Sequence, residues 1–92
     1  MPTCKRFVIS GRVQGVGFRY FVQSVASRES VVGWVRNLDD GRVETAAAGE
    51  TDAMERFEQA LRQGPPASRV ETVIVDDSFP LGPMSQNGFR IR

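Results

Sequence analysis

The sequence contains no histidine and only one cysteine, Cys4. A single cysteine cannot form a disulfide within the chain, so Cys4 is expected to be a bystander thiol. Without histidine, the Ser–His and Cys–His pairs of nucleophilic catalysis and most transition-metal sites are excluded. Catalysis by this chain would therefore have to rely on arginine, asparagine, carboxylates or the backbone.

Long apolar runs and an excess of charge are absent as well. No apolar run approaches the roughly 18–20 residues that cross a bilayer, and no signal-peptide segment follows residues 1–6. Twelve Lys and Arg residues against eleven Asp and Glu residues give a net charge of +1, which is not typical of nucleic-acid-binding proteins. We expect a cytoplasmic protein without membrane or nucleic-acid partners, folded as a single domain over residues 1–92.

The hydrophobic pattern changes its period along the chain, from the alternation typical of strands to the spacing typical of helices. It predicts strands at 5–13, 31–38, 42–48 and 69–76, helices at 19–29 and 52–63, and a short last strand at 89–92. The order β-α-β-β-α-β is the split β-α-β arrangement. We therefore predict an α+β fold, in which two helices cover one face of a mainly antiparallel sheet.

Short motifs predict how these elements begin and end. The Asp-Asp-Gly sequence at 39–41 is a hairpin signal, and its Asp-Gly pair favours a type I′ turn. Thr51 is predicted to cap the second helix, and Gly-Pro-Pro at 64–66 to stop it. Residues 80–84, with two prolines and a glycine, are predicted to form a loop.

The stretch between the first strand and the first helix is rich in glycine and ends in an arginine. Gly15 and Gly17 allow conformations in which consecutive N–H groups turn inward around an anion. The helix N-terminus adds free N–H donors, and Arg19 adds a planar fork that matches phosphate oxygens. The residues alone do not decide between an anion site and a plain glycine-rich connection that ends in a solvated arginine. Tyr20 stands where a dinucleotide fingerprint requires its third glycine, and no Gly-Lys-Ser/Thr follows.

Three segments together resemble the acylphosphatase family. They are Gly-Arg-Val-Gln-Gly-Val-Gly-Phe-Arg at 11–19, Gly-Trp-Val-Arg-Asn at 33–37 and Asp-Gly-Arg-Val-Glu at 40–44. The resemblance covers essentially the whole chain, and it implies a ferredoxin-like sandwich with strand order 4-1-3-2. It also implies hydrolysis of small-molecule acyl phosphates to a carboxylate and inorganic phosphate, with no metal, cofactor or covalent intermediate.

The resemblance also implies the site residues. Five consecutive backbone N–H groups bind the phosphoryl group: those of Gln14, Gly15, Val16, Gly17 and Phe18. Arg19 is the phosphate-binding arginine that closes this loop, and Asn37 positions the attacking water. Inorganic phosphate or sulfate is expected to compete with the substrate, and the protein is expected to be a monomer. One departure is Ser30, where a glycine or asparagine is more usual, and we expect a looser end of the first helix there.

Two binding functions compete with the enzymatic interpretation. Split β-α-β sheets also form RNA-recognition domains, which stack bases on aromatic side chains of their middle strands. The predicted third strand has neither aromatic nor basic residues at 43–48, and Trp34 is predicted to be a packing residue. The second alternative is a domain that binds phosphate without turnover, similar to the acylphosphatase-like domains of larger maturation proteins. Turnover of a synthetic acyl phosphate distinguishes the enzyme from both alternatives.

Overall fold

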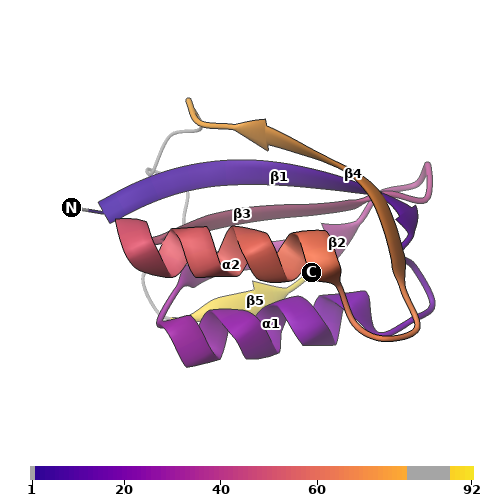
Figure 1. The fold of residues 1–92 in the computed structure, drawn as a ribbon, viewed down its shortest axis with the longest axis horizontal. Helices are drawn as coiled ribbons and strands as arrows, with labels where there is room; N and C mark the ends of the chain where they lie inside the picture. The colour runs from indigo at the N-terminus through magenta and orange to yellow at the C-terminus, as the bar shows by residue number, and fades with distance from the viewer. Residues whose placement is uncertain (1, 79–87) are drawn as a thin grey trace.

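The computed structural model describes residues 2–78 and 88–92. Its elements follow the order β-α-β-β-α-β, with one short strand added at the end (Figure 1). They are β1 (Pro2–Arg12), α1 (Phe18–Glu29), β2 (Val32–Asn37), β3 (Val43–Glu50), α2 (Thr51–Gln63), β4 (Arg69–Asp76) and β5 (Phe89–Ile91). All the predicted strands and helices are therefore present, whereas the predicted loop at 80–84 lies outside the described residues.

The strands form one sheet in the order β4-β1-β3-β2-β5, and both helices cover the same face of it (Figure 1). Phe7 in β1 is opposite Thr45 in β3 and Val75 in β4, and both of these pairings are antiparallel. β2 also pairs antiparallel with β3, whereas β5 pairs parallel with β2. The predicted α+β sandwich and its strand order 4-1-3-2 are confirmed, and β5 extends the sheet beyond β2.

The main core lies between the sheet and the two helices. Alternation along β1 directs Phe7 and Ile9 toward this side, where both are fully buried, and the Phe7 ring lies 5.9 Å from the Phe57 ring of α2. Burial of one such side chain contributes about 1.5–3 kcal/mol. Phe18, the first residue of α1, is only 2% exposed. The core therefore holds the N-terminus of α1 in place.

The other face of the sheet has no helix over it in the described part of the chain (Figure 1). Trp34 packs here against Ala46, as a partly buried residue, so its predicted packing role is confirmed. The neighbouring carboxylate of Glu44 is 4% exposed and accepts hydrogen bonds from the guanidinium groups of Arg6 and Arg36. Burial raises the pKa of Glu44, but these hydrogen bonds outweigh it and leave the pKa below its ordinary value.

The type I′ turn predicted at 39–41 is wrong. The N–H of Gly41 donates to the carbonyl oxygen of Leu38 at 3.2 Å. The N–H of Leu38 donates to the carbonyl oxygen of Arg42 at 2.8 Å. Among the described residues, Gly41 has φ 95° but neither aspartate has a positive φ. A type I′ turn requires a positive φ at both central residues. In the observed three-residue loop the positive φ lies at Gly41, so neither aspartate has to adopt an unfavourable left-handed conformation.

The predicted stop of α2 at Gly64 is confirmed, whereas the predicted start of α2 and the predicted end of α1 need correction. Thr51 is the first residue of α2 and the N-cap is Glu50, whose backbone is extended with φ −64° and ψ 150°. The Thr51 hydroxyl is 3.0 Å from the Thr3 hydroxyl of β1, so it bonds across to the sheet. At the end of α1, Ser30 adopts the left-handed conformation with φ 58°, and backbone hydrogen bonds close the last turn. The looser helix end expected at Ser30 is therefore not found.

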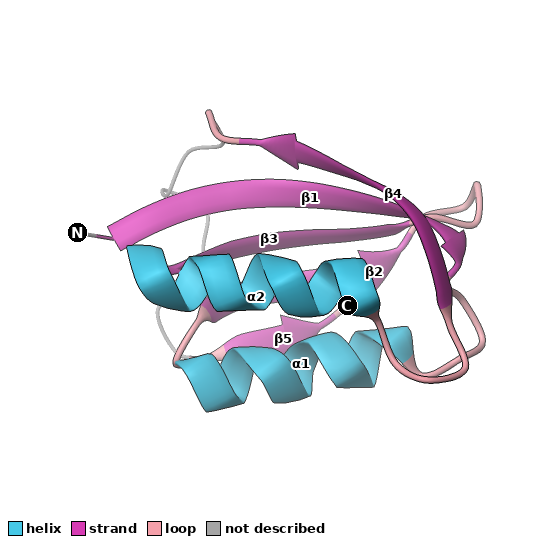
Figure 2. Ribbon diagram, viewed as in Figure 1, coloured by secondary structure: helices cyan, strands magenta, loops and turns pink. Residues whose placement is uncertain are grey.

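Three connections lie at one end of the molecule, as Figure 2 shows. They are the loop between β1 and α1, the hairpin between β2 and β3, and the connection between α2 and β4. The first carries the glycine-rich stretch, and the second begins directly after Asn37, the last residue of β2. The fold thus brings both sequence motifs to the same edge.

Candidate active site

The loop between β1 and α1 has the backbone geometry expected of an anion site. Gly15 and Gly17 have φ values of 74° and 76°, and a Cβ atom built on either would meet no other atom within 4 Å. Gly17 is the N-cap of α1, and no side chain caps this helix end. The first turn of α1 contains no acidic residue. Its N-terminal N–H groups therefore have no side-chain cap, and an anion could accept hydrogen bonds from them.

A cavity of about 110 Å³ lies beside this loop. It is lined by Val13, Gly15, Gly17, Phe18, Arg19, Tyr20 and Asn37. The structure thus brings Arg19 of α1 and Asn37 of β2 to one cavity with most of the loop predicted to bind phosphate. Gln14 and Val16 belong to the same loop but are not among the lining residues.

The side chain of Gln14 has a role that the sequence did not indicate. Its amide nitrogen donates hydrogen bonds to the carbonyl oxygens of Leu38 and Arg42, at 2.8 and 3.0 Å. These two residues face each other across the β2–β3 hairpin. Gln14 therefore ties the glycine-rich loop to the hairpin that follows Asn37. A glutamine in a loop carries no pattern that would have identified this contact.

The last described residues also reach the site. Nη1 of Arg19 donates a hydrogen bond to the carbonyl oxygen of Arg92 at 3.2 Å. The backbone N–H of Arg92 in turn donates to the carbonyl oxygen of Val35 in β2 at 2.8 Å, and its guanidinium lies over the Trp34 ring, 4.8 Å from the centroid. β2 thus holds Arg92, and Arg92 orients Arg19 from the side.

Asp40 of the hairpin stabilises the turn, as the sequence predicted. Oδ1 of Asp40 accepts from the backbone N–H of Arg42 at 3.1 Å, and Oδ2 accepts from its Nε at 2.8 Å. The hydrogen bond from the Arg42 side chain lowers the pKa of Asp40 below its ordinary value. A carboxylate with a lowered pKa is a weaker base. Neither aspartate is among the residues that line the 110 Å³ cavity.

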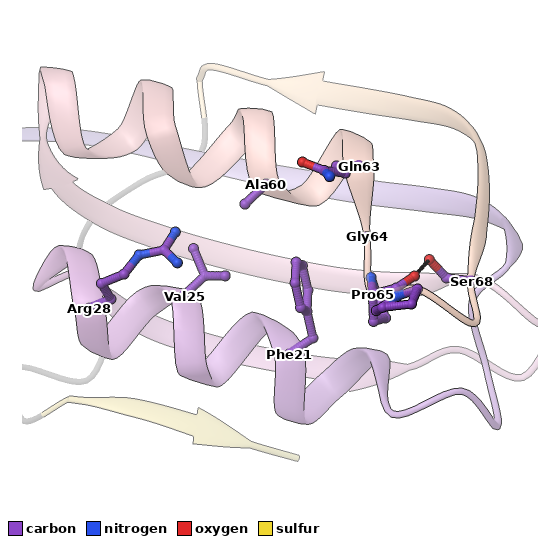
Figure 3. A pocket seen from close by; sticks show the side chains of 9 residues that line it. Phe21, Val25, Arg28, Ala60, Gln63, Gly64, Pro65 and Ser68 are labelled. Carbon is purple, nitrogen blue, oxygen red and sulfur yellow. Dashed lines mark hydrogen bonds between the residues drawn. The ribbon is translucent and has the colours of Figure 1, made fainter.

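A larger cavity, of about 530 Å³, lies between α1 and α2 and continues to the α2–β4 connection (Figure 3). Phe21, Val25, Ala60 and Pro65 supply apolar lining, and Arg28 is the one charged residue among those that line it. This groove contains none of the predicted site residues. The chemistry of the lining therefore favours the smaller cavity as the site, whatever the difference in volume.

Two further features bear on the classes of function. Within residues 2–78 and 88–92, no group of three or more cysteine, aspartate or glutamate side chains is placed to hold a metal ion. The same residues include no helix that is both long and apolar enough to span a membrane.

Known proteins are similar to this chain in both sequence and fold. The Acylphosphatase family model matches residues 5–91. An acylphosphatase of Bacillus velezensis is 51% identical over 74 residues, which are 80% of this chain and 82% of that protein. A crystal structure of the Bacillus subtilis acylphosphatase superposes with a TM-score of 0.90 at 43% identity, covering 100% of this chain and 99% of that one.

A longer protein contains the same fold as one of its parts. The structure of full-length HypF in its phosphate- and nucleotide-bound form matches with a TM-score of 0.83 at 25% identity. The match covers 100% of this chain and 12% of that one. The family model and the relatives of similar length decide the assignment: the chain belongs to the acylphosphatase family, and its activity is the hydrolysis of acyl phosphates.

Proposed function

We propose that the glycine-rich loop and Arg19 bind the phosphoryl group of the substrate and that Asn37 positions the attacking water. The observation that carries this proposal is that Arg19 and Asn37, from different elements, line one cavity with Gly15, Gly17 and Phe18. The backbone N–H groups of Gln14–Phe18 supply hydrogen bonds to the phosphoryl oxygens. Arg19 adds a bidentate cation.

The reaction needs little beyond charge stabilisation and alignment. The Asn37 amide holds a water in line with the bond between phosphorus and the acyl oxygen. The water oxygen forms the new bond to phosphorus, and the acyl oxygen leaves with its electron pair as a carboxylate. A carboxylate is a good leaving group, so it requires no strong general acid. Because an amide is a poor base, the water proton passes to a phosphoryl oxygen of the substrate.

We further propose that the reaction proceeds without a metal ion. The N–H donors and Arg19 can balance the charge on the phosphoryl oxygens, and the donor set of the cavity, an arginine, a tyrosine and an amide, is poor in metal ligands. Activity on an acyl phosphate should survive exhaustive chelation, and phosphate monoesters should be poor substrates. Loss of activity in chelator that a divalent cation restores would contradict this part of the proposal.

Two substitutions separate the proposed roles. Arg19→Lys keeps the charge but removes the fork, so it should weaken inhibition by inorganic phosphate and lower kcat by on the order of 10²–10³. Asn37→Ala should lower kcat while the inhibition constant of phosphate stays near that of the wild type, because the loop and Arg19 remain. Arg62→Lys and Gln59→Ala, both on the exposed side of α2, are matched controls that should change neither constant.

The same measurements decide between turnover and simple binding. A domain that only binds phosphate would show an inhibition constant or dissociation constant for phosphate but no hydrolysis above the solvent rate. Full kcat in Asn37→Ala would make Asn37 a structural strand-end residue and leave the mechanism without its water. Competition by sulfate, the monomeric state and a cytoplasmic location stay predictions, and sedimentation of the purified protein tests the second of these.

A further inference from the structure

Tyr20 is the most exposed large hydrophobic side chain of the described residues. Its side chain is 69% exposed, and the one other large hydrophobic side chain in this class is Ile74 of β4, at 55%. Single exposed aromatic residues are common and carry no meaning by themselves. The position of Tyr20 distinguishes it, because it is the third residue of α1 and lines the 110 Å³ cavity beside Arg19.

The size of that cavity limits what it can hold. It is small, about 110 Å³, and the proposed function places the phosphoryl group in it, against the loop and Arg19. In an in-line displacement the water and the acyl oxygen lie on opposite sides of phosphorus. The acyl group of the substrate must therefore lie at the mouth of the cavity, in contact with residues on its rim.

Two glycines share the cavity lining with Tyr20 and carry no side chain that could fill the space beside them. Gly15 and Gly17 present bare backbone there, and no atom lies within 4 Å of where their Cβ atoms would be. Among the described residues, no hydrogen bond holds the Tyr20 hydroxyl, so the ring can turn over a bound group. Tyr20 and Asn37 also enter the cavity from different elements, α1 and β2.

We propose that Tyr20 determines acyl-group specificity, and that its ring packs against flat, apolar acyl groups of the substrate. This inference rests on the proposed function of the loop, Arg19 and Asn37. The preferred substrate class is then acyl phosphates with an aromatic or other flat apolar acyl group, over those with a small acyl group. The contact forms in the bound substrate as well as in the transition state, so it acts on KM more than on kcat.

The test compares benzoyl phosphate with acetyl phosphate in wild type, Tyr20→Ala, Tyr20→Phe and the control Ile74→Ala. One aromatic pair corresponds to about a 2- to 12-fold change in affinity. In Tyr20→Ala, the KM for benzoyl phosphate should therefore rise about 2- to 12-fold relative to the KM for acetyl phosphate. Tyr20→Phe keeps the ring and should keep the wild-type ratio, as should Ile74→Ala, and circular dichroism checks that each variant is folded.

The outcomes separate this inference from the function on which it rests. If the wild type hydrolyses both compounds and Tyr20→Ala leaves the ratio of their KM values unchanged, the specificity role is overturned and the proposed function stands. A drop in kcat alone, equal for both compounds, also overturns it, because that result assigns Tyr20 to the chemical step. Absence of hydrolysis of either compound by the wild type overturns the proposed function and the inference together.

Discussion

The two helices of this fold begin in opposite ways. At the start of α2, Asp52 lies in the first turn and its Oδ1 accepts a hydrogen bond from the N–H of Ala53 at 3.0 Å. The N-cap residue makes no side-chain cap hydrogen bond in either helix, but at the start of α1 no acidic residue is present and Arg19 places a cation beside the positive end of the helix dipole. α2 therefore compensates the dipole at its own N-terminus, whereas at α1 the anion of the proposed function would do so.

The C-terminal ends differ in a related way. The C-cap residue of α2 is Gly64, with φ 70°, and that of α1 is Ser30, with φ 58°. Left-handed backbone costs a residue with a Cβ atom roughly 1–2 kcal/mol that glycine avoids. α1 therefore carries an unfavourable residue at each end, while α2 carries a favourable one at each end. These end residues favour α2 over α1, and α1 is the helix that carries the proposed site.

The largest expected effect comes from giving α1 the first-turn acid that α2 already has. Arg19→Glu removes the phosphate-binding fork and adds a like charge, so kcat/KM should fall by at least on the order of 10²–10³. The free energy of unfolding without phosphate should nevertheless rise, by about 0.3–1 kcal/mol, because the helix dipole is now compensated. Activity assays and urea unfolding measure the two effects.

The matched control for this variant is Asp52→Asn in α2. It removes the charge of an exposed side chain from the first turn and should lower the free energy of unfolding by a similar amount, about 0.3–1 kcal/mol. Its activity should equal that of the wild type, since α2 does not line the cavity. A fall in stability for Arg19→Glu would show that the two N-termini are not opposed in the way described.

A second comparison exchanges the residue types at the helix ends. Gly64→Ala should lower the free energy of unfolding by about 1–3 kcal/mol, because its Cβ atom would lie 2.3 Å from Oγ of Ser68 and its φ is positive. Ser30→Gly should raise it by about 0.5–1 kcal/mol through relief of the left-handed strain. Urea unfolding of both variants measures the contrast. If both variants changed the free energy of unfolding by the same amount in the same direction, the described difference between the two helix ends would be contradicted.

The smallest expected effect is the pH dependence of the contact that joins the helices. Glu29 of α1 accepts a hydrogen bond from Nε of Arg56 in α2 at 2.7 Å, which lowers the pKa of Glu29 below its ordinary value. The unfolded state therefore binds more protons near the ordinary carboxyl pKa of about 4.3. The contribution of this contact to the free energy of unfolding is complete above a pH of about 4.3 and is lost as the pH falls through the lowered pKa of Glu29.

Glu29→Gln should consequently reduce the slope of Tm against pH between about pH 5 and 3. Glu71→Gln is a suitable control, because Glu71 is exposed on β4 and forms no ion pair with the described residues. Thermal unfolding followed by circular dichroism gives both slopes. A wild-type slope in Glu29→Gln would assign the acid sensitivity to other carboxylates.

The parts of the site that the sequence revealed are those encoded locally. Gly15, Gly17 and Arg19 lie within five positions of one another, so their spacing alone indicated a loop that turns into a helix. Asn37 was identified only through the resemblance to the family, and the observed strand order then brings β2 to the same edge. The contact between Arg19 and Arg92 joins residues 73 positions apart, and no local pattern predicts such a pair.

The turn and cap predictions went wrong for a different reason. An Asp-Gly pair suits both a two-residue turn and a three-residue loop, and the pairing of Leu38 with Arg42 selected the longer one. Thr51 has the side chain of an N-cap, but its hydroxyl bonds to Thr3 of β1. Short motifs often permit two structures of similar energy, and contacts with distant strands then decide between them.

The hydrogen bonds from Gln14 to Leu38 and Arg42 also determine how the site moves. They join the glycine-rich loop to the β2–β3 hairpin, so we expect the two segments to open together and to share one amide-exchange rate. A fluctuation that distorts the proposed phosphate-binding loop would then also displace the end of β2 that carries Asn37. We therefore expect the two halves of the proposed site to form and to lose their arrangement together in the free enzyme.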